Sequence, residues 1–295
     1  MIDPSADHPA FATVNTPLIF AILLVVDSLH FIFARALVPL LPPEMSSFLL
    51  LGIAAVQVGI YQAARGKIRF GTLRRRWRFF AAIGVLVAAS TVINYAAVAY
   101  IDPGTASLLG KAGVVFSLGM GLIWLRERLR PIELLGALSA IAGAFLISFQ
   151  PGDYLRIGSV LVLASAFFYA LHTAIVKRYG EAMEFGDFFL FRIAATAFFL
   201  FLFAAGRGQL VWPSGRAWLV VFIAATVDVV ISRSLYYLSL RRMSMSIHTI
   251  ILTLSPVVTI LWSLALFREV PTPTSLIGGA LVILGVALVT LRPRK

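Results

Sequence analysis

The chain repeats itself once, and this repeat constrains the fold more than any other feature. Displacing the sequence by 142 positions, without a gap, places the Arg-Glu dipeptide at 126–127 on the Arg-Glu dipeptide at 268–269. The same offset aligns His30 with His172, Ser90 with Ser232, Tyr95 with Tyr237, Gly136 with Gly278, and Gly143 with Gly285. A single offset that holds over most of a chain indicates a tandem duplication. We therefore expect two structurally related halves.

Both halves are built mainly of apolar segments. Hydrophobic residues make up 60% of the 295 residues and charged residues only 13%, whereas a soluble domain carries roughly 25% charged residues. Apolar runs of the length that crosses a bilayer, about 20 residues, recur along the whole chain. Because the bilayer core offers no water to the backbone, each run is predicted to be a helix. The sequence thus indicates an all-α membrane protein.

Ten transmembrane helices are predicted, five in each half. Residues 1–16 are interpreted as a cytoplasmic tail, residues 17–149 as the first five-helix repeat and residues 157–291 as the second, within one membrane domain. Short polar links rich in Pro and Gly separate the helices and leave no room for another domain. The predicted spans are 17–37, 47–64, 79–100, 104–125, 132–149, 157–177, 187–205, 216–240, 244–267 and 274–291.

The distribution of Lys and Arg predicts the orientation of these helices. If the N-terminus is cytoplasmic, the inner loops hold most of the basic residues, including the cluster at 74–78. Cytoplasmic loops are enriched in positive charge, so both termini are expected inside the cell. The basic cluster adjoins a span and is interpreted as a headgroup anchor, so the expected partner is the lipid bilayer and not a nucleic acid.

An odd number of helices per repeat has a topological consequence. The second half must enter the membrane with the opposite orientation, which gives two inverted five-helix repeats. Such repeats typically surround a central cavity that opens to alternate sides of the membrane. The sequence therefore favours a transporter of a small molecule.

Five charged residues fall within the predicted spans, where a charge is costly unless it is paired or lines a cavity. They are Asp27, Lys111, Arg192, Asp228 and Arg233. Two interpretations of Lys111 are open: it receives a substrate carboxylate, or it pairs with Asp27 or Asp228. Arg192 is expected to extend toward the cytoplasmic headgroups, and Arg35 toward the outer ones.

Polar residues at helical spacing mark the faces that should surround the cavity. The first helix carries Asp27 and His30 on one face, and the sixth carries their repeat mates Tyr169 and His172. A second stripe, Asp228 with Ser232 and Tyr236, has Ser90 and Asn94 as mates on the third helix. The two histidines are interpreted either as packing residues or as gating residues. Spans one, three, four, six, eight and nine are expected to enclose the cavity, and the mainly apolar spans two, five, seven and ten to face lipid.

Aromatic and proline residues add further candidates. A ligand with a flat ring would stack on Tyr95, Tyr169, Tyr237, Trp124 or Trp262. Pro256 lies inside the ninth predicted span, where it should kink the helix and mark a hinge.

The ten spans, the inverted halves and two short motifs resemble the drug/metabolite transporter superfamily, and within it the EamA-type exporters. The motifs are Trp-Leu-Arg-Glu-Arg-Leu at 124–129 and Leu-Phe-Arg-Glu-Val at 266–270. The resemblance covers nearly the whole chain. It implies a secondary transporter that exports amino acids, aromatic and other bulky ones above all, or related metabolites across the inner membrane by alternating access.

Two alternative functions are weighed against this one. A proton-coupled exporter of cationic drugs would use Asp27 as its proton carrier, but the excess of positive charge in the spans argues against it. A membrane-embedded lipid-processing enzyme would need a cluster of nucleophile, base or metal ligands, and no such motif is present. No cofactor or metal is expected, and the chain is predicted to be a monomer or weak homodimer.

The residues predicted to contact substrate are Lys111, His30, Asp27, Asp228, Arg233, Tyr95, Tyr237, Tyr169, His172 and Asn94. Those predicted to act in gating or as a hinge are Pro256 and Trp124.

Overall fold

The computed structural model describes residues 16–124, 131–148, 156–180, 183–236, 252 and 254–290, and within these ranges every regular element is a helix. The first half contains α1 (Thr16–Ser28), α2 (His30–Leu37), α3 (Pro43–Ala64), α4 (Phe70–Arg75), α5 (Trp77–Ala97), α6 (Pro103–Gly110), α7 (Gly113–Ile123) and α8 (Pro131–Ser148). The second half contains α9 (Ile157–Tyr179), α10 (Phe185–Gly206), α11 (Gly215–Ala224), the π-helix η2 (Ala225–Ile231), α14 (Ser255–Phe267) and α15 (Pro273–Thr290).

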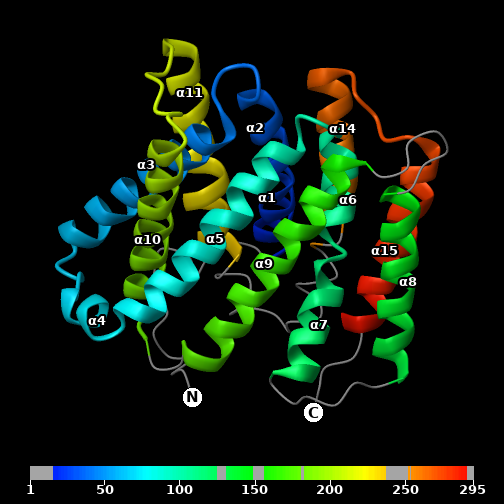
Figure 1. Cartoon of the computed structure of the whole chain (residues 1–295), viewed down its shortest axis with the longest axis horizontal. Helices are drawn as coiled ribbons and strands as arrows, with labels where there is room; N and C mark the ends of the chain where they lie inside the picture. Colours follow the sequence, from blue (N-terminus) through cyan, green and yellow to red (C-terminus); the bar gives the residue numbers. More distant parts are fainter. Residues whose placement is uncertain are drawn as a thin grey trace.

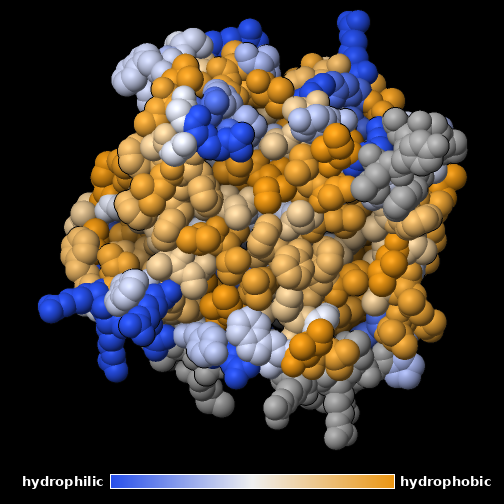
Figure 2. All heavy atoms as spheres, viewed as in Figure 1, coloured by the Kyte–Doolittle hydropathy of each residue, from blue (hydrophilic) through white to orange (hydrophobic). Residues whose placement is uncertain are grey.

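Seven helical segments among the described residues are long and apolar enough to cross a membrane, and two shorter apolar helices follow them. The long segments are Pro43–Ala64, Trp77–Ala97, Pro103–Ile123, Pro131–Ser148, Ile157–Tyr179, Phe185–Gly206 and Gly215–Tyr236. Apolar side chains cover the middle of the face shown in Figure 2, and hydrophilic ones collect along its upper and lower edges. The protein is therefore a multi-pass, all-helical membrane protein, whereas the count of ten spans stays a prediction.

Local sequence signals explain where several helices begin and end. The Asp102 carboxylate accepts a hydrogen bond from the Thr105 backbone N–H at 2.7 Å, and Pro103 opens α6 with no N–H to satisfy. Arg268, which follows α14, adopts a left-handed backbone conformation with φ 58° and ends that helix.

Pro256 lies close to the start of α14. α14 begins at Ser255, so Pro256 lies in the first turn of the helix. At that position a missing N–H removes no helical hydrogen bond, and the fixed φ of proline favours helix initiation. A kink or hinge at Pro256 within the ninth span stays a prediction, because residues 244–251 and 253 of that span lie outside the described residues.

The two halves meet most closely where α8 packs against α15 (Figure 1). These helices are repeat mates and run in opposite directions (Figure 1). A Cβ on any of four glycines would collide with the backbone of the opposite helix, so only glycine permits this approach; they are Gly136, Gly143, Gly278 and Gly285. Gly136 faces Gly285, and Gly143 faces Gly278. Because the repeat offset converts each of these contacts into the other, the interface has twofold symmetry.

A second contact in this interface lies at its centre. The Ser139 hydroxyl donates a hydrogen bond to the backbone carbonyl of Leu281, its own repeat mate, at 2.9 Å. A residue that touches its mate lies beside the symmetry axis. Since α8 and α15 are antiparallel, that axis runs across the helices and not along them.

Candidate functional site

A cavity of about 500 Å³ lies between the two halves. Its walls are built from α1, α2, α3, α5, α6 and α7 of the first half and from α9, α10, η2, α14 and α15 of the second. All five charged residues that the sequence places inside spans line it. The volume is in the range of about 300–1,000 Å³ that is typical of small-molecule sites.

The helices around the cavity are interrupted where they reach it. A turn at Leu29 separates α1 from α2, and a turn at Lys111 and Ala112 separates α6 from α7. On the opposite wall, η2 is a π-helix that contains Asp228. Irregular backbone at membrane depth is tolerated where it lines a cavity, and π-bulges occur frequently at functional sites. These interruptions thus bring polar side chains to the cavity from spans that are otherwise apolar.

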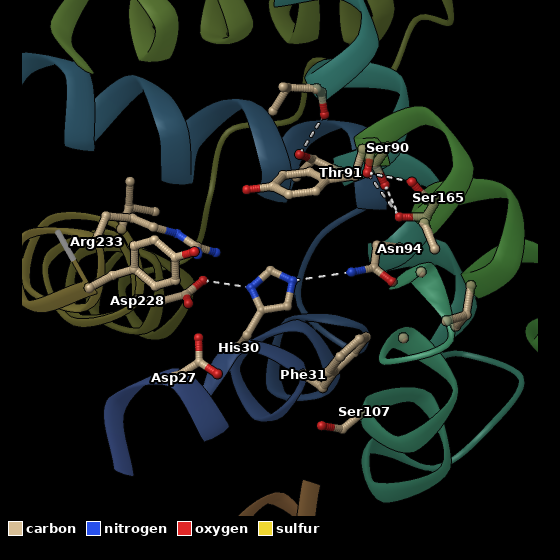
Figure 3. Close-up of a pocket in the computed structure, with 18 of the residues that line it drawn as sticks. Asp27, His30, Phe31, Ser90, Thr91, Asn94, Ser107, Ser165, Asp228 and Arg233 are labelled. Atoms are coloured by element: carbon tan, nitrogen blue, oxygen red, sulfur yellow. Dashed lines mark hydrogen bonds and ion pairs between the residues drawn. The ribbon is translucent and has the colours of Figure 1, made fainter. Parts of the chain in front are cut away.

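His30 joins the first and second halves through its ring nitrogens (Figure 3). Nδ1 lies 2.8 Å from the Asp228 carboxylate, and Nε2 lies 3.2 Å from the amide nitrogen of Asn94. Because an amide nitrogen can only donate, Nε2 accepts a hydrogen bond from Asn94, and Nδ1 keeps its proton and donates a hydrogen bond to the Asp228 carboxylate. The ring is therefore held in one tautomer, with both of its nitrogens satisfied.

Lys111 lies close to Asp27. Its Nζ is 3.9 Å from the Asp27 carboxylate, and both side chains are partly exposed to the cavity. Lys111 also caps the C-terminal end of α6, where the helix dipole favours a positive charge. This geometry favours the interpretation of Lys111 as an ion-pair partner of Asp27 over that of a carboxylate receptor.

The second half contributes a cluster in which fewer polar groups are paired. His172 is buried, and neither ring nitrogen makes a hydrogen bond within the described part of the chain. It lies behind Tyr169, whose ring centroid is 5.2 Å away and which itself lines the cavity. His172 is not among the residues that line the cavity, and its contact with a substrate stays a prediction.

Arg192 of α10 is also part of this cluster. The residue is only 8% exposed, lines the cavity, and lies next to Tyr169 and His172. The prediction that Arg192 extends to the cytoplasmic headgroups is therefore wrong. Arg233 also lines the cavity, close to Asp228 (Figure 3).

Two predicted aromatic contacts differ in their placement. Tyr95 lines the cavity, with its ring edge-to-face against His30 at 5.9 Å, and its hydroxyl has no hydrogen-bond partner in the described ranges. Trp124 follows the end of α7, away from the cavity lining. There its carbonyl accepts a hydrogen bond from Arg178 at 3.1 Å. Tyr237 lies outside the described residues.

Arg35 was expected to reach the outer headgroups, but it joins the two halves instead. Its guanidinium forms an ion pair with Glu269 and donates to the Val98 carbonyl at 2.8 Å. Glu269 follows α14, so this contact links α2 to the second half.

Several lining residues were not among the predicted substrate contacts, and three of them carry an aromatic ring or a charge. Phe31 follows His30, and Phe189 and Arg192 lie on α10, which was expected to face lipid along its length. The positions of α10 that line the cavity are 189, 192, 193 and 196, which is the spacing of one helix face. This periodicity around Arg192 was visible in the sequence and would have identified the face. α3 and α15 also contribute a few apolar lining residues.

Among the described residues, no group of three or more His, Asp or Glu side chains is arranged to hold a metal ion. The chemistry of the cavity is that of paired and unpaired charges, hydroxyl groups and aromatic rings. Groups of these kinds are able to bind and orient a small polar molecule.

Comparison with known proteins places this architecture in a family. Residues 15–149 and 156–291 each match the model of the EamA-like transporter family. A crystal structure aligns with 94% of this chain and 97% of its own chain, at a TM-score of 0.66 and 22% sequence identity, which supports the fold.

Two curated relatives carry descriptions of transporters. The "Uncharacterized transporter YdfC" of Bacillus subtilis is 27% identical over 199 residues, 66% of this chain and 65% of its own length. A "Probable terminal-alkyne amino-acid exporter" of Streptantibioticus cattleyicolor is 30% identical over 199 residues, 65% of this chain and 66% of its own length. The matched regions thus span just under two thirds of each relative. Family and relatives together confirm the prediction of a transporter and not an enzyme.

Proposed function

Because the chain belongs to the EamA-like transporter family of the drug/metabolite transporter superfamily, we propose that it exports amino acids or related small metabolites across the inner membrane. Aromatic and other bulky hydrophobic amino acids are the proposed substrates. One of the two relatives is described as an amino-acid exporter, which supports this substrate class.

The observation that carries the proposal is the composition of the cavity wall. An amino acid presents a carboxylate, an ammonium group and a side chain, and each needs a different partner. The wall offers the cations Lys111, Arg192 and Arg233, and the carboxylates of Asp27 and Asp228. It also offers rings for stacking, namely Phe31, Tyr95, Tyr169, Phe189 and Tyr236. An amino acid with an aromatic side chain therefore finds cations for its carboxylate, carboxylates for its ammonium group and rings for its side chain in this cavity.

The proposed mechanism is alternating access between two inverted five-helix repeats, at 17–149 and 157–291, with ten spans and both termini cytoplasmic. The antiparallel packing of α8 on α15 supports an axis in the membrane plane, and the loops rich in Lys and Arg support the orientation. Exchange of conformation between the halves would open the cavity first to one side and then to the other.

The test is efflux from proteoliposomes that contain the purified protein. Liposomes are loaded with one radiolabelled amino acid at a time, and release is compared with that from protein-free liposomes. We expect release of aromatic or bulky apolar amino acids above the control rate. Release of none of the amino acids, together with release of a lipophilic cation such as tetraphenylphosphonium, would replace this proposal with the drug-export alternative. Lys111 beside Asp27 disfavours that alternative, because a cationic ligand would have to displace it.

A further inference from the structure

Arg192 differs from the other charges of the cavity in its surroundings. The residue is more than nine-tenths buried, and its Nε is buried without a hydrogen-bond partner in the described part of the chain. No carboxylate of the described residues lies within ion-pair distance of it. A charge at this depth is costly unless something neutralises it. Arg192 therefore has no counter-ion among the described residues.

The two carboxylates of the cavity are already engaged elsewhere. Asp27 faces Lys111 at 3.9 Å, and Asp228 accepts from His30 at 2.8 Å. Neither aspartate therefore pairs with Arg192. The groups beside Arg192 are the Tyr169 phenol and the His172 ring, which do not supply a carboxylate.

The repeat shows that this arginine is not part of the shared scaffold. Under the offset of 142 positions its mate is Leu50 on α3, which lines the cavity from the other half. α3 and α10 pack against each other as mates, so both positions face the same space. A leucine satisfies the fold at one of them. The fold therefore does not by itself require a charge at the other position.

We propose that Arg192 binds the carboxylate of the transported molecule, so that the substrates of this protein are carboxylates. A guanidinium presents parallel N–H donors that match the two oxygens of a carboxylate, and such charge-assisted pairs are the strongest hydrogen bonds that proteins form. Lys111 then stays with Asp27 and does not receive the substrate. This inference deepens the proposed function, because it treats the cavity as the transport site.

The experiment measures ligand binding to the purified full-length protein, by isothermal titration or by ligand-induced thermal stabilisation in detergent. Three probe sets are compared: standard L-amino acids, their carboxamides, and carboxylates without an ammonium group, such as benzoate and indole-3-acetate. The variants are Arg192→Gln and Arg192→Lys. The matched control is Arg207→Gln, which makes the same change at an exposed arginine paired with Glu44 outside the cavity.

In the wild-type protein, we expect each amino acid that binds to do so at least tenfold more tightly than its carboxamide. Arg192→Gln should raise the apparent Kd for the acid at least tenfold and leave the Kd for the carboxamide nearly unchanged. Arg192→Lys should give an intermediate value, because a single ammonium keeps the charge without the paired donors. Arg207→Gln should change neither Kd by more than about twofold.

The outcomes separate this inference from the proposed function. Binding of benzoate or indole-3-acetate that depends on Arg192, without binding of any amino acid, would support the carboxylate site and reject amino-acid export. Equal affinity for acids and carboxamides in the wild-type protein would overturn the inference even if Arg192→Gln fails to fold. Absence of binding by every carboxylate tested would overturn it as well.

Discussion

His30 and His172 occupy equivalent positions in the two repeats, yet their surroundings differ. His30 donates to Asp228 and accepts from Asn94, so both of its ring nitrogens are paired. His172 is buried with neither ring nitrogen paired among the described residues. Both repeats carry a histidine at the equivalent position, but among the described residues only the ring of His30 has hydrogen-bond partners.

The charges near each histidine differ in the same way. On the side of His30, Asp27 faces Lys111 and Asp228 faces the histidine, so each acid has a partner. On the side of His172, Arg192 has no carboxylate within ion-pair distance in the described ranges. The charges around His30 are thus paired with one another, whereas the wall around His172 holds an unpaired positive charge on Arg192 among the described residues. This wall is where an anionic group of a ligand would be stabilised most.

The sharpest test of this difference replaces each histidine by phenylalanine. His30→Phe should lower the free energy of unfolding by about 2 kcal/mol, because Asp228 is left buried without its donor. His172→Phe should change it by less than about 0.5 kcal/mol, because no hydrogen bond is lost. Thermal unfolding in detergent micelles measures both. Equal losses in the two variants would show that the walls do not differ as described.

The second largest effect on stability is expected for the pair of Lys111 and Asp27. Lys111→Met should lower the free energy of unfolding by about 1–2 kcal/mol, less than for a fully buried pair, because both side chains are partly exposed. Adding Asp27→Asn should restore most of the lost stability and folded yield, since the remaining charge is removed with its partner. A double variant as unstable as the sum of the single ones would mean that the two residues do not interact.

On the wall around His172, removal of a charge should increase stability instead of lowering it. Arg192→Met removes a buried charge that has no carboxylate partner and keeps much of the apolar side chain. We expect the free energy of unfolding to rise by about 0.5–1 kcal/mol while ligand binding is weakened, as is common when a functional residue is removed. A loss of stability comparable to that of Lys111→Met would indicate a structural role for Arg192.

The smallest effect is expected at Tyr95. Its hydroxyl is buried without a partner in the described part of the chain, so Tyr95→Phe removes a group that makes no hydrogen bond there. The free energy of unfolding should change by less than about 0.5 kcal/mol. The ring remains to pack edge-to-face on His30. A loss above about 1 kcal/mol would reveal a partner for the hydroxyl.

Much of the architecture was determined by the sequence itself. Apolar runs of sufficient length specify membrane helices, because a helix pairs all of its backbone N–H and C=O groups internally, as the lipid environment requires. The offset of 142 positions identified the duplication, and the glycines at 136, 143, 278 and 285 became the contact between α8 and α15. Charges within apolar runs identified the cavity, because burial in lipid excludes them elsewhere. All five of those residues line it.

The partners of these charges were decided only by the tertiary structure. His30 and Asp228 are 198 positions apart, and Arg35 and Glu269 are 234 apart. Helical periodicity specifies which side chains share a face of one helix, but not how far that helix is shifted or rotated against another. The contacts of Arg192 with Tyr169 and His172, and the placement of Pro256 in the first turn of α14, depended on how the helices pack and where they break. Those features follow from packing between distant segments, which no local pattern records.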